Sequence, residues 1–150
     1  MNQEGTVRAR LLGAWRITAY VTERADGDRF APLGDSLQGY ICYTQDGVVS
    51  VNLQQPNREP YASGDPSVVT TSELAAAAAG YFAYAGRFVV DETTAIVTHD
   101  VEISLVPNWI GTQQRRTVIF DGDRLELRAI APSLMAGEMR TIRVFWQRVR

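Results

Sequence analysis

Residues 95–130 read AIVTHDVEISLVPNWIGTQQRRTVIFDGDRLELRAI, and this segment decides the fold. Apolar residues recur at every second position in three stretches, 95–105, 113–120 and 125–130. A period of two is typical of half-buried β-strands. The loop at 106–112 contains proline and glycine, and Asp-Gly-Asp at 121–123 is a tight turn. The segment therefore predicts three strands that follow one another through short connections.

The same pattern continues outward to both ends of the chain. Five further strands are predicted, at 14–22, 39–44, 48–54, 87–91 and 141–149. Asp46-Gly47 is a strong hairpin signal between two of them. Thr70 and Glu73 form a capping box before a run of alanines, which predicts one helix at about 71–83. Eight strands in series with one inserted helix favour a single all-β domain, 1–150, folded as an antiparallel up-and-down barrel, because closure removes exposed sheet edges.

The composition excludes several kinds of chemistry. The chain has 150 residues, with 15 basic against 17 acidic, which argues against binding to nucleic acid or to an anionic membrane. Every basic residue is arginine, so Schiff-base chemistry and a P-loop lysine are excluded. Cys42 and His99 are the only cysteine and histidine, too few for the usual zinc sites. We expect no metal and no cofactor.

No segment for export or membrane insertion is expected. The N-terminus, 1–8, lacks the basic and apolar regions of a signal peptide. No apolar run approaches the roughly 18 residues of a membrane-spanning helix. We therefore expect a cytoplasmic protein.

Strand alternation indicates which side chains face the barrel interior. In 95–105 the inward set is Val97, His99, Val101, Ile103 and Leu105. In 113–120 it is Gln114, Arg116, Val118 and Phe120. This pairing places His99 within a few residues of Val118 and Phe120, with Arg116 further toward the open end.

The first strands are less clear. Trp15, Ile17, Ala19 and Val21 share one parity and are expected to face inward. In 39–44, parity alone does not settle whether Tyr40 and Cys42 or Ile41 and Tyr43 face the cavity.

Several motifs resemble a known family. Gly13-Ala14-Trp15 is similar to the G-x-W signature of lipocalin and calycin barrels. GYICYTQDG (39–47), YASGDP (61–66), GYFAYAG (80–86) and VTHDVE (97–102) with PNWIGTQQRR (107–116) together resemble the bacterial and fungal lipocalin-like domain family. The resemblance covers about 11–149 and implies an eight-stranded calycin-type barrel with a helix after the third strand. It also implies that Arg148 or Arg143 packs on Trp15, and that the protein accompanies a secondary-metabolite pathway.

Two inward polar residues are candidate catalytic residues. The pKa of His99, ordinarily about 6.5, suits proton transfer, although the residue could equally be a hydrogen-bonded interior histidine. Arg116 must either be paired or face a ligand anion such as a carboxylate, an enolate or a phenolate. The candidate ligand-binding residues are Tyr40, Tyr43, Tyr81, Tyr84, Asn108, Trp109 and Gln114. Trp109 is read either as a lid or stacking surface or as a cover for the core, and the helix as a barrel cap or plug, with a lid as the alternative.

Three functions fit these residues. The first is a binding module for a small, largely apolar ligand, such as a polyketide-like intermediate. The second is a cofactor-independent cyclase or isomerase that uses the same cavity. The third is a protein-interaction module with a filled barrel, which a cavity below roughly 300 Å³ would favour. A homo-oligomer is left open.

Overall fold

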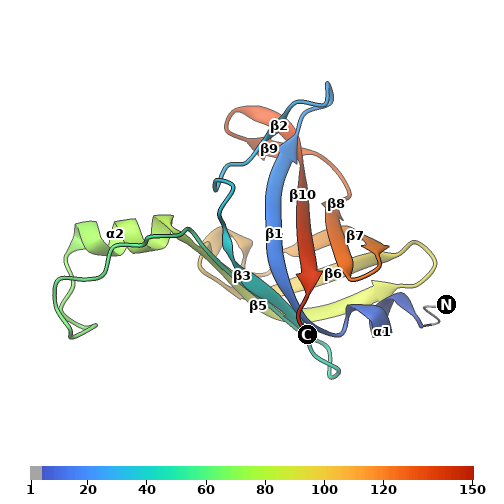
Figure 1. The fold of residues 1–150 in the computed structure, drawn as a ribbon, viewed down its shortest axis with the longest axis horizontal. Coiled ribbons are helices and arrows are strands. Elements are labelled where there is room, and N and C mark those ends of the chain that lie inside the picture. Colours follow the sequence, from blue (N-terminus) through green and yellow to red (C-terminus); the bar gives the residue numbers. More distant parts are fainter. Residues whose placement is uncertain (1–4) are drawn as a thin grey trace.

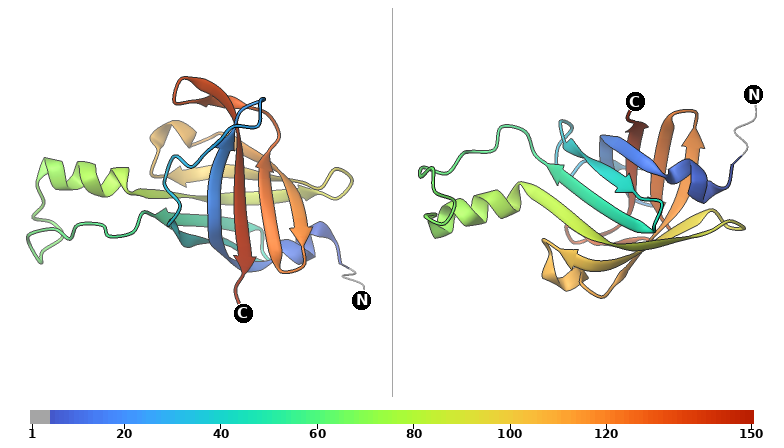
Figure 2. Two further views of the ribbon diagram at one scale, coloured as in Figure 1. Left: turned by 45° about the horizontal axis from the view of Figure 1, so that its top comes forward. Right: turned by 90° about the horizontal axis from the view of Figure 1, so that it is seen from below.

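The computed structural model describes residues 5–150 and shows a closed barrel (Figures 1 and 2). The strands are β1 (Gly13–Glu23), β2 (Arg29–Phe30), β3 (Gln38–Tyr43), β4 (Val48–Gln54), β5 (Tyr81–Asp91), β6 (Ile96–Ser104), β7 (Gln113–Asp121), β8 (Arg124–Ala129), β9 (Ser133–Met135) and β10 (Glu138–Arg148). They pair in the order β2-β1-β3-β4-β5-β6-β7-β8-β10-β9, and β1 also pairs with β10. The short β2 and β9 lie outside this ring. The remaining eight strands form the predicted antiparallel up-and-down barrel.

The connections give the barrel two different ends. At one end, which we call the turn end, tight turns join β3 to β4, β5 to β6 and β7 to β8. The opposite end, which we call the loop end, carries the longer connections 24–37, 55–80, 105–112 and 130–137. The 3-10 helix η1 (Pro107–Trp109) lies in one of these loops. The C-terminus and helix α1 (Val7–Leu11) lie at the turn end (Figure 1).

The turn end is closed by α1, which the sequence did not predict. Thr6 caps this helix, and Glu92 accepts hydrogen bonds from the amides of Val7 and Arg8 at 2.6 and 3.1 Å. Leu11 is fully buried, and its carbonyl accepts a hydrogen bond from Nε1 of Trp15 at 2.9 Å. The expectation that the N-terminal stretch 1–8 is not a signal peptide falls partly on residues 1–4, which lie outside the described residues.

The contact expected on Trp15 is made by Arg148. Its guanidinium carbon lies 4.0 Å from the centroid of the indole ring. Arg148 also donates hydrogen bonds to the carbonyls of Leu12 and Arg10, so it joins α1, β1 and β10. Arg143, the alternative, instead forms ion pairs with Glu126 and Glu23.

Helix α2 (Thr71–Ala79) does not fill the barrel. The predicted capping box between Thr70 and Glu73 is present, but the helix ends at Ala79 rather than near 83, and β5 begins at Tyr81 instead of Arg87. None of its residues is buried, and the helix projects from the barrel wall with the segment that precedes it (Figures 1 and 2). The prediction that this helix caps or plugs the barrel is therefore wrong.

At two β-bulges the side chains that face inward differ from those predicted by strand alternation. A register shift between Ile17 and Ala19 reverses the parity of β1, so Tyr20 and Thr22 are buried in place of Ala19 and Val21. A second register shift, between Ala85 and Gly86 on β5, lies opposite Val101–Ile103 on β6 and reverses the parity of β6 at that point. It leaves Ile103 66% exposed and Leu105 40% exposed, although both are predicted to face inward. At Gly86 a Cβ would lie 1.7 Å from the Asp100 carbonyl oxygen, so this close approach requires glycine.

The other predicted interior positions are confirmed. Val97, His99, Val101 and Val118 are buried, and Phe120 packs against the core. In β3 the inward pair is Ile41 and Tyr43. His99 pairs with Gln114 and Val97 with Arg116, so these polar side chains lie on neighbouring strands closer to the loop end than Val118.

Candidate functional site

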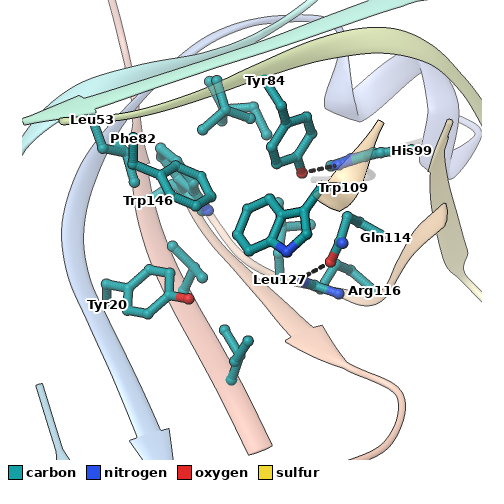
Figure 3. A pocket seen from close by; sticks show the side chains of 14 residues that line it. Tyr20, Leu53, Phe82, Tyr84, His99, Trp109, Gln114, Arg116, Leu127 and Trp146 are labelled. Carbon is teal, nitrogen blue, oxygen red and sulfur yellow. Dashed lines mark hydrogen bonds between the residues drawn. The ribbon is translucent and has the colours of Figure 1, made fainter. Parts of the chain in front are cut away.

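A pocket lies inside the barrel, between its middle and the loop end (Figure 3). Its walls are mostly aliphatic and aromatic, and its polar groups come chiefly from β5, β6 and β7. The lining residues are Tyr20, Ile41, Val51, Leu53, Phe82, Tyr84, His99, Trp109, Gln114, Arg116, Leu127, Ile142, Val144 and Trp146. Five of the nine residues predicted for the site, Tyr84, His99, Trp109, Gln114 and Arg116, are therefore brought together here.

His99 is held between two tyrosines. Its Nε2 lies 2.7 Å from the Tyr43 hydroxyl, and its Nδ1 lies 2.6 Å from the Tyr84 hydroxyl. His99 is 1% exposed, and burial, aided by the positive charge of Arg116, lowers its pKa to about 3. The imidazole is therefore neutral near pH 7, with both nitrogens engaged.

The two tyrosines keep their protons. Burial raises the pKa of Tyr43 well above its usual value, and burial likewise raises the pKa of Tyr84. Tyr43 lies behind His99 and does not line the pocket, whereas Tyr84 does. The three side chains thus connect the barrel core to the pocket through hydrogen bonds.

Arg116 lines the pocket but has no carboxylate as a partner among the described residues. Its guanidinium donates to Oε1 of Gln114 at 3.0 Å and to the carbonyl of Arg115 at 2.9 Å. None of the ion pairs formed within residues 5–150 involves Arg116. Both of its polar contacts are to neutral oxygens, so its charge is available to an anion in the pocket.

Trp109 covers the pocket from the loop end. It packs edge-on against Phe82, with ring centroids 5.0 Å apart, and against Tyr84, at 6.3 Å. The other thirteen lining residues lie on strands, whereas Trp109 lies on η1. The free space beneath it is about 50 Å³. That volume suits a few water molecules and falls short of the roughly 300 Å³ of a small-molecule pocket.

Three predicted ligand-binding residues lie elsewhere. Tyr40 is 41% exposed and stacks with Arg16 on the outer surface of the barrel. Tyr81 lies on the same outer surface, where its hydroxyl donates to Asn52 at 3.0 Å. Asn108 is exposed on η1 and does not line the pocket.

The sequence did not point to Tyr20 or Trp146. Tyr20 enters the pocket because of the β1 bulge, which period-two parity does not anticipate. Trp146 is 3% exposed, and its Nε1 is the one buried side-chain polar atom in the described part of the chain without a hydrogen-bond partner. An unsatisfied buried donor is costly, and it lies on a residue of the pocket lining.

The described residues show no arrangement suited to a metal. Within 5–150, no group of three or more His, Cys, Asp and Glu side chains lies close enough to hold an ion. None of the helices in this range combines the length and the apolar character that a membrane crossing requires.

These features define a closed up-and-down β-barrel with an internal pocket. Residues 12–149 match the family described as the lipocalin-like domain, and the chain belongs to that family. The resemblance noted in the sequence is thereby confirmed.

Similar proteins include one carrier and two solved barrels. The 4'-hydroxy-3'-methoxypropiophenone carrier protein ppsC of Aspergillus oryzae (strain ATCC 42149 / RIB 40) is 35% identical over 107 residues, which cover 67% of this chain and 96% of that protein. A redesigned beta barrel aligns with a TM-score of 0.47 and 11% identity over 99% of this chain and 100% of its own. EF1p2_mFAP2b bound to DFHBI aligns with a TM-score of 0.45 and 12% identity over 97% and 100%.

Proposed function

We propose that the barrel binds a small, largely apolar molecule, an aryl ketone or polyketide-like intermediate of secondary metabolism. The observation that carries the proposal is the composition of the pocket. Apolar walls would give affinity, while Tyr84, Gln114 and Arg116 gather polar groups on one side to orient the ligand. The likeness to a protein named as a carrier of 4'-hydroxy-3'-methoxypropiophenone supports the same ligand class. A cytoplasmic location stays a prediction of the sequence, and the possibility of a homo-oligomer stays open.

A ligand of this size can bind only if the pocket enlarges. The free space of about 50 Å³ holds no aryl ketone, and the strand-borne walls are fixed by the barrel hydrogen bonds. Trp109 is the lining residue that a loop carries, so its outward movement would open the space with the least disturbance of the core. In this proposal Trp109 acts as a lid and then as a stacking surface for the ligand.

The two other functions drawn from the sequence have less support. The small free volume favours a filled barrel that serves as an interaction module, and ligand titration separates that function from binding. A cyclase or isomerase would need a group that takes up a proton. Both nitrogens of His99 are engaged by tyrosines, so it offers no free nitrogen to a substrate.

The proposal is tested by titration of the purified chain with 4'-hydroxy-3'-methoxypropiophenone in a calorimeter. We expect saturable binding with one site per chain. Ile142→Trp narrows the pocket and should weaken binding by about tenfold or more, or about 1.4 kcal/mol. Met139→Trp, on the same strand but 57% exposed and outside the pocket, is the matched control and should bind like the wild type. No saturable binding, or equal binding by Ile142→Trp, overturns the proposal.

A further inference from the structure

The polar groups that line the pocket include a positive charge and several hydrogen-bond donors but no negative charge. Arg116 is positively charged, and Tyr20, Tyr84 and Trp146 each carry an O–H or N–H donor. Not one of the fourteen lining side chains is a carboxylate. The Nε1 of Trp146, a residue of this lining, has no hydrogen-bond partner within the described residues. A ligand that satisfies these groups must bring acceptor oxygens and negative charge.

The chain of hydrogen bonds through His99 adds a further donor. Neutral imidazole has one N–H and one acceptor nitrogen, so one tyrosine donates to it and the other accepts from it. Tyr43 is 2% exposed, and His99 is its only polar partner in the described residues, so its proton is satisfied only by donation to Nε2. Nδ1–H then donates to the Tyr84 oxygen, which leaves the Tyr84 proton free to point into the pocket.

Two arginines on other strands of the barrel show what Arg116 lacks. Arg143 on β10 lies 2.9 Å from Glu23 and 2.9 Å from Glu126, and Arg128 on β8 lies 2.7 Å from Glu126. Both of these arginines are therefore paired with carboxylates that the chain supplies. Arg116 is half-buried, lines the pocket and has no such carboxylate, so an anion in the pocket would supply the missing partner.

We propose that this pocket takes its ligand as an oxyanion conjugated to a ketone, a phenolate or an enolate, with Arg116 as counter-ion and Tyr84 as hydrogen-bond donor. The inference rests on the proposed function and states which form of the ligand is bound. An acidic phenol or enol binds with heterolytic loss of its O–H proton to the buffer, and nothing is oxidised or reduced.

No titratable group in the pocket lining, nor Tyr43 behind it, competes for that proton. Tyr20 from β1, Tyr43 from β3 and Tyr84 from β5 are neutral, because burial raises the pKa of each phenol. His99 from β6 is neutral because burial lowers its pKa. The lining residues from β4, β8, β10 and η1 carry no titratable group. Arg116 is then the one charge in the pocket, so the proton leaves to solvent.

The experiment uses the visible and ultraviolet spectrum of 4'-hydroxy-3'-methoxypropiophenone. Its phenolate absorbs at longer wavelength than its phenol because the charge is conjugated to the ketone. At a pH below the pKa of the free phenol, we expect the bound probe to show a phenolate-to-phenol ratio at least about tenfold higher than the free probe. Calorimetry in buffers of different ionisation enthalpy should report the released proton.

Two variants and a second probe separate the outcomes. Arg116→Met should abolish the phenolate band, whereas Arg115→Met, on the outer face of the same strand, should keep it. The probe 3',4'-dimethoxypropiophenone cannot ionise and should bind Arg116→Met as well as the wild type, which shows that the variant is folded. Two results would overturn this inference but not the proposed function. One is saturable binding of the phenol with a phenolate-to-phenol ratio equal to that of the free probe. The other is a phenolate band that persists in Arg116→Met. Failure of both probes to bind overturns both.

Discussion

The two ends of the barrel are built from the same strands but are finished in opposite ways. At the turn end, Trp15 is 1% exposed, donates a hydrogen bond to the Leu11 carbonyl and stacks with Arg148. At the loop end, Trp109 is half-buried on a 3-10 helix and meets only the rings of Phe82 and Tyr84 among the aromatic contacts. Each end thus places an indole over the core: Trp15 is fully buried and hydrogen-bonded, whereas Trp109 is half-buried and lies in a loop.

This difference separates stability from function. The turn end joins the first and last strands through α1 and Arg148, so it secures barrel closure. The loop end surrounds the pocket, and its connections bury little. Regions that must open for a ligand come from the less stable part of a fold. Substitutions at the two ends should therefore have different effects.

The largest effect is expected from Trp15→Ala. This change removes a fully buried indole, the hydrogen bond to Leu11 and the surface on which Arg148 stacks. Truncation of a buried aromatic residue costs about 3–5 kcal/mol, a large part of the stability of a small domain. Urea unfolding followed by circular dichroism measures the loss. A loss below about 1 kcal/mol would show that the turn end does not secure the barrel.

His99, midway between the ends, should give the next largest effect. Its pKa is about 3 in the folded chain and about 6.5 in an unfolded one, so the unfolded state binds more protons between these values. The stability that neutral His99 contributes is fully present above about pH 6.5 and is lost progressively as the pH falls toward 3. His99→Gln should cost about 1–3 kcal/mol at pH 7 through the two tyrosine hydroxyls and should flatten the pH dependence.

The informative range for that measurement is roughly pH 6.5 to 4.5, above the ordinary pKa values of carboxylates. Burial raises the pKa of Glu126, but hydrogen bonds from Arg143 and Arg128 outweigh burial and lower it to about 2. The stability that ionised Glu126 contributes to the folded chain is therefore lost only below about pH 4.5. Equal slopes for wild type and His99→Gln between pH 6.5 and 4.5 would contradict a neutral buried imidazole.

Trp109→Ala should affect binding more than stability. Because the indole is half-buried on a loop, we expect a loss of about 1 kcal/mol or less in the free energy of unfolding. Removal of the lid should increase the association rate of 4'-hydroxy-3'-methoxypropiophenone by about tenfold, since the closed state no longer limits entry. Stopped-flow fluorescence measures the rate, with the remaining tryptophans as reporters. An unchanged association rate would show that the ligand does not enter past Trp109.

The sequence predicted the architecture well because turns and alternation are local properties. Asp46-Gly47 and the 121–123 turn fix two hairpins, and alternation in 95–101 places His99 inside. The failures occur where a non-local event changes the local pattern. A bulge in β1 turns Tyr20 inward, and another opposite Gly86 turns Ile103 outward. A bulge depends on the neighbouring strand, so period-two parity on a single strand does not detect it.

The site was predicted in part for the same reason. His99 precedes the register shift on β6, and Gln114 and Arg116 lie on β7, whose pairings show no register shift, so parity holds for all three and they meet in the pocket. Tyr40 and Tyr81 share residue type with Tyr84 but face outward, and only the assembled sheet reveals their direction. The position of α2 was missed because a capping box defines where a helix starts and not what it packs against.

The smallest effect on the whole chain is expected at α2, the part of the loop end most distant from the core. Thr70→Ala removes the cap in which the Thr70 hydroxyl accepts from the Glu73 amide at 3.2 Å. A cap contributes about 1 kcal/mol to its helix, and isolated helices shorter than about 12–15 residues are marginal. Since α2 buries none of its nine residues, the loss should remain local. Hydrogen exchange of the 71–79 amides should accelerate by about fivefold while urea unfolding stays within about 0.5 kcal/mol of the wild type. Thr71→Ala, one position further and not the cap, should leave both unchanged, and a matching loss of global stability in Thr70→Ala would show that α2 is coupled to the barrel.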